Sequence, residues 1–233
     1  MYYYDKINKK ARGRSAGKAG IMTFDTVVAI GRQYGSGGRE IGELLADLMG
    51  VPFFDRELIA LAAERSGVSR DVYAHIDETA TNSLLYALST GAYTISGHFT
   101  SVSDLPLNDK LYIIQTNLIQ DLVKQNGACV IVGRCADYIL RDDPRCVSVF
   151  IHAPMAARIE RICRKEELSP AQAESRIIKT DKKRANYYNF YTNREWGDIK
   201  NYDLCINASV LGKEKTAQLI LDFIKERENL RKA

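Results

Sequence analysis

Hydrophobic and polar residues divide this chain into two kinds of segment. Short, uninterrupted apolar runs, typical of strands buried on both faces of a parallel sheet, lie at 26–30, 51–54, 128–132, 147–151 and 204–207. Between most of them lie longer segments whose apolar residues recur three and four positions apart, the period of a helix that buries one face. This alternation predicts an α/β fold in which helices cover both faces of a parallel sheet.

The helical period predicts helices at 41–48, 56–66, 109–126, 153–166 and 213–231, and another that opens after Ser169. Glycines at positions 50 and 127 are expected to end two of them in the left-handed conformation. The segment Ser169-Pro170-Ala171-Gln172 has the pattern of a capping box with proline at the first helical position. Leu48 and Leu219 are expected on the inward faces of their helices.

The first predicted strand runs into a loop with four glycines, Gly31-Arg-Gln-Tyr-Gly-Ser-Gly-Gly38. Glycine adopts positive φ without steric cost, so successive backbone N–H groups can point into one concavity. The helix that follows adds unpaired N–H groups and the positive end of its dipole. The layout predicts a phosphate-binding loop; the alternative is a glycine-rich turn in an unrelated α/β protein.

The loop departs from the Walker A pattern G-x-x-x-x-G-K-[ST], whose lysine reaches the terminal phosphates and whose hydroxyl binds magnesium. Gly38 follows Gly37 where that pattern has lysine, and Arg39 and Glu40 come next. We expect Arg39 to supply the missing positive charge. Glu40 has no hydroxyl, so Mg²⁺ would need another ligand.

Length and composition favour one domain at 24–233, preceded by a basic, disordered arm at 1–23. The chain has 233 residues, a formal net charge of +4 and five cysteines without a CxxC pair. Such cysteine usage indicates reduced thiols in a soluble, cytoplasmic protein. The charge suits an anionic small molecule, and a solvated arm is favoured over one that binds nucleic acid. No apolar run reaches membrane-spanning length, and the sequence leaves the oligomeric state open.

Residues 68–108 lack a regular period and are expected to form an insertion that covers the substrate. His75 and His98 lie there without metal-ligand spacing to each other or to a cysteine, so no metal site is predicted from protein side chains.

Five segments, taken in order, resemble the cytidylate kinase-like family, a branch of the P-loop nucleoside monophosphate kinases. They are AIGRQYGSGGREIGELLADLMGVPFFDRELI, VIVGRCADYIL, VFIHAPMAARIERI, DKKRANYYNFY and YDLCINAS. The resemblance implies a P-loop NTPase-type three-layer α/β/α fold with a helical monophosphate-binding insertion and a lid at about 158–195. It also implies transfer of a phosphoryl group from ATP, with Mg²⁺, to a monophosphate such as CMP or dCMP.

The resemblance assigns expected roles to matching positions. Those expected to hold the donor phosphates are Gly35, Ser36, Gly37, Gly38, Arg39 and Glu40. Those expected to bind the acceptor are Asp55, Arg56, Arg134, Asp181 and Arg184, and those expected to act in phosphoryl transfer are Arg39, Arg134, Arg158, Arg161 and Arg184.

Several alternatives stay open at this point. Arg158, Arg161 and Lys165 share a helix face that could be merely solvated, and Asp181 and Arg184 could form a surface ion pair. The aromatic residues at 187–196 are expected to pack rather than to stack on a base. The protein could also be a nucleotide-binding sensor without catalysis, a kinase for another small hydroxylated metabolite, or an RNA-binding protein that uses its basic arm.

Overall fold

The computed structural model describes residues 24–55 and 107–232. The predicted arm at 1–23, Arg56, the predicted helix at 56–66 and the predicted insertion up to residue 106, with its two histidines, lie outside the described residues. The domain boundaries therefore stay predictions.

The five predicted strands are present and all neighbouring pairs are parallel. They are β1 (Val27–Arg32), β2 (Phe53–Phe54), β3 (Cys129–Val132), β4 (Cys146–His152) and β5 (Leu204–Asn207), in the order β2-β3-β1-β4-β5. β1 lies at the centre, with Val27 opposite Cys129 of β3 on one side and Cys146 of β4 on the other. The predicted parallel sheet is confirmed.

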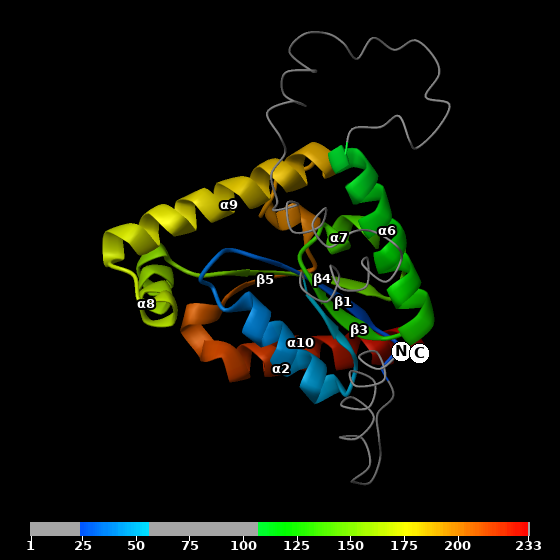
Figure 1. Ribbon diagram of the computed structural model, residues 1–233. Helices are drawn as coiled ribbons and strands as arrows, with labels where there is room; N and C mark the ends of the chain where they lie inside the picture. Colours follow the sequence, from blue (N-terminus) through cyan, green and yellow to red (C-terminus); the bar gives the residue numbers. More distant parts are fainter. Residues whose placement is uncertain (1–23, 56–106, 233) are drawn as a thin grey trace, which may run out of the picture.

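Helices cover both faces of this sheet (Figure 1). They are α2 (Gly38–Met49), α6 (Leu107–Asn126), α7 (Ala136–Ile139), α8 (Met155–Glu166), α9 (Pro170–Thr192) and α10 (Ala208–Lys232). α2 and α10 lie on one face, α6 and α7 on the other, and α8 and α9 form a helical hairpin beyond the carboxyl ends of the strands (Figure 1). A 3₁₀ turn, η2 (Ile199–Asn201), leads into β5.

Two apolar clusters fill the space between the sheet and its helices. Side chains of α2 and α10, such as Leu45 and Ile220, pack on one face. Ile119 of α6 and the tyrosines 187 and 188 of α9 pack on the other. A separate small cluster around Ile162 and Ile177 holds α8 against α9. The hairpin thus has its own packing, and the carboxyl-terminal part of α9 also joins the main core.

Local sequence signals placed most helix ends correctly. Gly50 and Gly127 have φ angles of 67° and 68°, and Ser169 and Gln172 form the predicted capping box. The inward positions of Leu48 and Leu219 were wrong: they are 49% and 45% exposed. The neighbouring positions Met49 and Ile220 are buried instead, because the direction of a helix face depends on its tertiary partner as well as on its period.

The residues just before β1 form hydrogen bonds with α10. Glu228, 2% exposed on α10, accepts hydrogen bonds from the Thr26 hydroxyl at 2.6 Å and from the Asp25 backbone N–H at 2.9 Å. Gly212 interrupts α10 with a φ of 75°, so its long continuous part begins at Lys213, as predicted.

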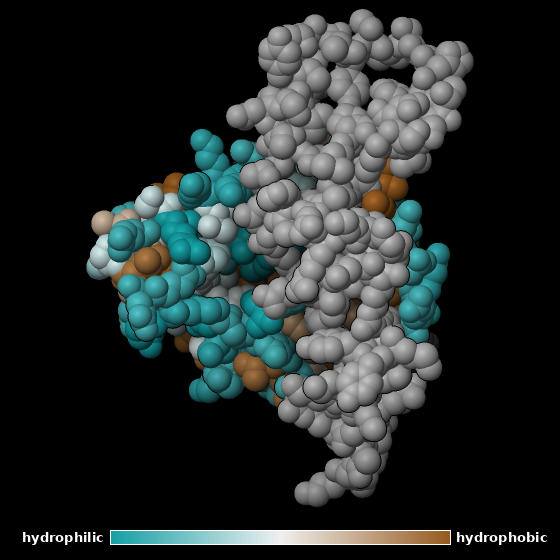
Figure 2. Space-filling view, in the orientation of Figure 1, coloured by the Kyte–Doolittle hydropathy of each residue, from teal (hydrophilic) through white to brown (hydrophobic). Residues whose placement is uncertain are grey.

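The surface over α8 and α9 is mostly hydrophilic, with isolated hydrophobic residues (Figure 2). Within residues 24–55 and 107–232, no helix combines the length and the apolar character that crossing a bilayer requires.

Candidate active site

The glycine loop follows β1 and leads directly into α2. Gly35 and Gly37 have φ angles of 80° and 89°, which most L-residues avoid. A Cβ at Gly37 would lie 3.2 Å from the guanidinium carbon of Arg161, and one at Gly35 would lie 3.1 Å from the Cβ of Arg158. The Ser36 hydroxyl turns back to the Gln33 carbonyl at 2.9 Å. The glycines therefore allow both the tight turn and the close approach of α8.

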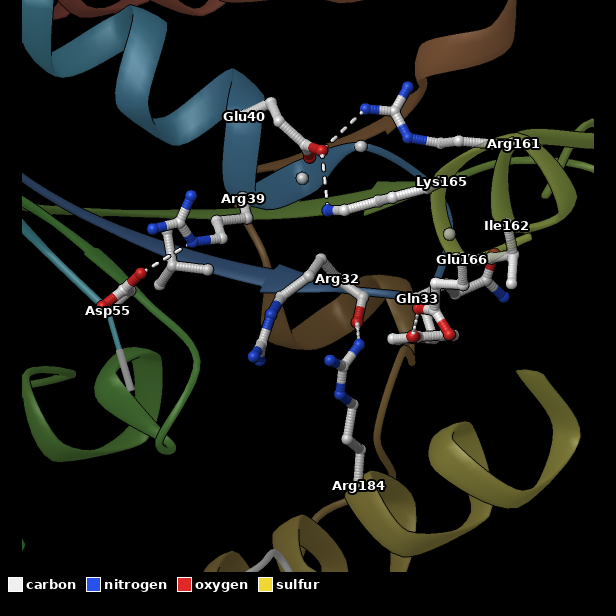
Figure 3. A pocket seen from close by; sticks show the side chains of 15 residues that line it. Arg32, Gln33, Arg39, Glu40, Asp55, Arg161, Ile162, Lys165, Glu166 and Arg184 are labelled. Carbon is white, nitrogen blue, oxygen red and sulfur yellow. Dashed lines mark hydrogen bonds and ion pairs between the residues drawn. The ribbon is translucent and has the colours of Figure 1, made fainter. Parts of the chain in front are cut away.

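A cavity of about 220 Å³, here called the loop pocket, opens between this loop and the hairpin (Figure 3). Gly35, Gly37, Gly38, Arg39 and Glu40 line it from the loop and from α2. Asp55, Arg161 and Arg184 line it from β2, α8 and α9. The structure thus brings together most of the residues assigned to the donor and acceptor sites. Among the described residues, the predicted site residues that do not line this pocket are Ser36, Arg134, Arg158 and Asp181, and their roles stay predictions.

Glu40 connects α2 to α8 across the loop pocket. Its Oε1 lies 3.0 Å from Arg161 Nη2 and 3.2 Å from Lys165 Nζ (Figure 3). The face of α8 that carries both cations is thus engaged with the loop and is not merely solvated. Burial acts to raise the pKa of Glu40, but a backbone hydrogen bond, Arg161 and Lys165 together lower it.

We expect Glu40→Gln to reduce stability at neutral pH and to have less effect in acid. A carboxylate whose folded pKa is depressed stabilises the fold above its unfolded pKa of about 4.3, and this contribution is lost as pH falls through the lower folded pKa. The expected loss at pH 7 is about 1 kcal/mol or less, since the site is partly exposed. Thermal unfolding of both proteins from pH 7 to pH 3 measures it. The exposed Glu174 gives the control, Glu174→Gln; a difference for Glu40→Gln that stays constant with pH would contradict the ion pairs.

Arg39, the cation expected to replace the Walker lysine, is engaged with two carboxylates. Its Nε lies 2.7 Å from Asp55 Oδ2, and its Nη1 lies 3.4 Å from Glu43 of the next helical turn. The side chain is 48% exposed, whereas that of Asp55 is 7% exposed. The arginine therefore neutralises the carboxylate at the end of β2. This geometry gives no support to Arg39 as the substitute for the lysine.

Asp181 and Arg158 form a largely buried ion pair between α9 and α8. Their side chains are 16% and 7% exposed. Asp181 also accepts a 2.7 Å hydrogen bond from the Tyr34 backbone N–H, and Arg158 donates to the Tyr34 carbonyl at 3.3 Å. The alternative of a surface pair between Asp181 and Arg184 is therefore wrong. The pair holds the glycine loop against both helices of the hairpin.

Arg134 lies at the end of β3 in a strained backbone. Gly133, Arg134 and Cys135 have successive φ angles of 81°, 62° and 56°, and the second and third cost energy because they are not glycine. Gln115, itself 2% exposed, donates a 3.0 Å hydrogen bond to the Arg134 carbonyl. A buried helix side chain thus supports the conformation that aims Arg134.

The Arg134 side chain is 3% exposed, and its Nε and Nη1 have no hydrogen-bond partner in the described structure. It lines a small pocket with Arg32, Arg184 and Asp137, here called the strand-end pocket. Burial raises the pKa of Asp137, although a 2.7 Å hydrogen bond from the Tyr188 hydroxyl opposes the shift. A buried guanidinium with unused donors needs an anion, because leaving them unsatisfied costs free energy.

Arg184 lines three neighbouring cavities, here called the three hollows of the site. It lines the loop pocket, the strand-end pocket and a larger groove of about 800 Å³ beneath α9, and its Nη1 donates to the Arg32 carbonyl at 3.1 Å (Figure 3). Arg176, Lys179 and Lys183 also line this groove. Cations thus surround the space on the hairpin side.

Sequence reasoning did not single out Arg32, and considered Lys165 only as part of a helix face. Arg32 lines all three hollows, and Lys165 lines the loop pocket. Arg32 is the last residue of β1 and could have been found from its place at the carboxyl end of a buried strand. Lys165 required the contact between α8 and α2, which sequence spacing does not reveal.

The aromatic residues at 187–196 mainly pack, as expected. Tyr187 and Tyr188 are buried in the cluster on the α6 face, and Tyr191 stacks on Tyr112 with ring centroids 4.2 Å apart. Trp196 meets Phe150 edge to face at 5.4 Å. These contacts fix α9 over the sheet.

A nucleotide with Mg²⁺ fits the donor set of this site. Mg²⁺ is typically held by one or two carboxylates together with substrate phosphates and water. Asp55 and Glu40 both line the loop pocket, and each is now paired with cations that phosphates could engage instead. No group of three or more His, Cys, Asp or Glu side chains suited to a metal occurs in the described ranges.

Comparisons with known proteins identify relatives of this chain. A cytidylate kinase of Methanobrevibacter smithii is 22% identical over 85% of this chain and 98% of its own length. Matches to some other cytidylate kinases are partial: the chain spans 41% of the one from Halobacterium salinarum, at 27% identity.

Two solved structures support the fold. An uncharacterized protein from Eubacterium ventriosum is 26% identical, with a TM-score of 0.65 over 86% of this chain and 98% of that one. A gluconokinase from Sinorhizobium meliloti, 14% identical, has a TM-score of 0.50 over 90% of this chain and 98% of its own. The fold is thus the predicted P-loop kinase type of α/β architecture. The model of the cytidylate kinase-like family matches residues 27–210, and the chain belongs to that family.

Proposed function

We propose that this protein transfers the γ-phosphoryl group of ATP to a nucleoside monophosphate, CMP or dCMP. Family membership supports a kinase, and the names of the related cytidylate kinases suggest the acceptor. The observation that carries the proposal is Arg134, whose buried guanidinium has unused donors at the end of β3. In open α/β sheets, ligands bind at the carboxyl ends of strands.

The residues divide between the two substrates. The glycine loop and the start of α2 offer backbone N–H groups to the donor phosphates, and Arg161 and Lys165 close over them from α8. Arg134 and Arg184 face the acceptor's phosphate, which arginine can bind through two parallel hydrogen bonds. Asp55 and Glu40 are the carboxylates available to bound Mg²⁺, which would neutralise charge on the β- and γ-phosphates.

The reaction needs positioning and positive charge more than covalent chemistry from the protein. An oxygen of the acceptor's phosphate forms a bond to the γ-phosphorus, and the bond from that phosphorus to the β–γ bridging oxygen breaks. ADP leaves with the electron pair of that bond. Arginines from β3, α8 and α9 surround the space in which this charge moves.

A coupled assay of ADP release tests the proposal with Mg-ATP and CMP, dCMP, UMP, AMP and GMP in separate reactions. We expect turnover that depends on the monophosphate and is fastest with CMP or dCMP. ADP release that is equally slow with every monophosphate and without one would overturn the proposed activity. A thermal shift with ATP in the same protein would then indicate a nucleotide-binding sensor.

A further inference from the structure

The glycine loop differs from the Walker A pattern at two positions, between which a glycine and a positively charged residue have changed places. With Gly37 as the second glycine of G-x-x-x-x-G-K-[ST], the first glycine falls at position 32 and the lysine at position 38. This chain has Arg32 and Gly38 there. Position 32 is thus an arginine where the pattern has glycine, and position 38 is a glycine where the pattern has lysine.

The structure gives a steric reason for the glycine at position 38. Gly38 is the first residue of α2, and its φ angle is not in the positive range. Its backbone conformation therefore does not require glycine. A Cβ at Gly38 would instead lie 2.5 Å from the Cβ and 3.1 Å from the Cγ of Arg32. The Arg32 side chain therefore fills the space in which a side chain at position 38 would begin.

From there Arg32 extends to the end of β3. A Cβ at Gly133 would overlap Nη1 of Arg32 and would lie 2.7 Å from its guanidinium carbon. The Arg32 side chain thus runs from Gly38, which contacts its base, to Gly133, which contacts its guanidinium. The guanidinium therefore lies next to the backbone that leads into Arg134. Arg184 fixes the start of the path through its hydrogen bond to the Arg32 carbonyl.

We propose that Arg32 binds the phosphate chain of the nucleotide in place of the lysine that is absent at position 38. The inference deepens the proposed function and rests on it for the identity of the nucleotide. Arg32 lines the loop pocket and the strand-end pocket, so its guanidinium lies where donor and acceptor phosphates would meet. Its planar, forked donors can hold oxygens of both groups, which an ammonium cannot do with the same geometry.

The first test measures binding of inorganic tripolyphosphate by calorimetry and by thermal shift, which requires neither an acceptor nor turnover. Arg32→Met keeps most of the side-chain volume and removes the charge. We expect the Kd to rise about 10- to 100-fold, the scale for loss of a hydrogen bond that involves a charged group, and the thermal shift to disappear. Arg39→Met should raise the Kd much less. Arg141→Met, at an exposed arginine that lines none of the three hollows, is the unchanged control.

The second test makes the exchange in the opposite direction. Gly38→Lys alone should lower Tm by several degrees, because its Cβ has no room beside Arg32. The double variant Arg32→Gly/Gly38→Lys should recover Tm and bind tripolyphosphate more tightly than Arg32→Gly alone. If Arg32→Gly proves unstable, Arg32→Met still decides the question of charge.

Each outcome separates this inference from the proposed activity. The inference is overturned if the wild type does not bind tripolyphosphate or if Arg32→Met binds it with unchanged affinity. It is also overturned if Gly38→Lys is as stable as the wild type, or if the double variant binds tripolyphosphate no better than Arg32→Gly. Tripolyphosphate binding that is lost in Arg32→Met, without turnover of any monophosphate by the wild type, would leave Arg32 as the phosphate ligand and would refute only the kinase activity.

Discussion

Replacement of Arg134 by methionine should nearly abolish phosphoryl transfer and, at the same time, stabilise the ligand-free protein. Methionine approximates the length of arginine and removes a guanidinium whose Nε and Nη1 have no partner in the described residues. Removing an arginine that stabilises a phosphoryl-transfer transition state lowers turnover by about 1,000-fold or more. Removing a buried guanidinium with two unsatisfied nitrogens should raise Tm, because folding no longer has to desolvate those donors.

Two measurements check this pair of effects: kcat/KM for the monophosphate by the coupled assay, and Tm by calorimetry without ligand. Arg141→Met provides the matched control at an exposed arginine, whose side chain is 40% exposed, and should change neither quantity. An Arg134→Met protein that is less stable than wild type would show that the guanidinium has a structural partner. Unchanged kinetics would remove Arg134 from the site.

Asp181→Ala should be the most destabilising single change at the site. It leaves Arg158 buried without its carboxylate and removes the acceptor for the Tyr34 N–H. Loss of one partner of a buried ion pair costs about 3–5 kcal/mol, which lowers Tm on the order of 10 °C in a domain of this size. Since the same carboxylate ties α9 to the glycine loop, we also expect weaker tripolyphosphate binding.

Denaturant unfolding of Asp181→Ala measures the first effect. Asp222→Ala serves as control, because Asp222 is 58% exposed and lies 3.8 Å from Lys225; it should change stability by about 0.5 kcal/mol or less. The double variant Arg158→Met/Asp181→Leu should recover much of the loss by replacing the pair with apolar packing. Equal effects of Asp181→Ala and Asp222→Ala would contradict a buried pair.

The sequence was sufficient for the fold because its signals are local. Five apolar runs, the glycines that end helices and the capping box at Ser169 each act within a few residues. The face of a helix was less certain. Leu219 and Ile220 both suit the period of α10, and the packing against β4 and α2 buries the second and exposes the first.

The site was harder to predict because its interactions join distant segments. Arg32 at the end of β1 and Arg39 at the start of α2 lie on either side of the glycine turn, and the sequence alone offered no reason to propose Arg32 over Arg39. The choice depends on Asp55, which engages Arg39, and on Gly38 and Gly133, which leave space for Arg32. Likewise, Asp181 is three residues from Arg184, but it pairs with Arg158 on another helix.

The central position of β1 has a consequence for the order in which this chain can fold during synthesis. The ribosome makes β1 first among the strands, but its neighbours β3 and β4 follow only after α6. The partner of its buried Thr26, Glu228, lies in the last helix. Because long-range pairings must wait for their partners, a nascent chain carries the apolar β1 and its glycine loop unpaired until β3 and β4 have been made. The glycine loop is therefore made before the strands and helices that support it.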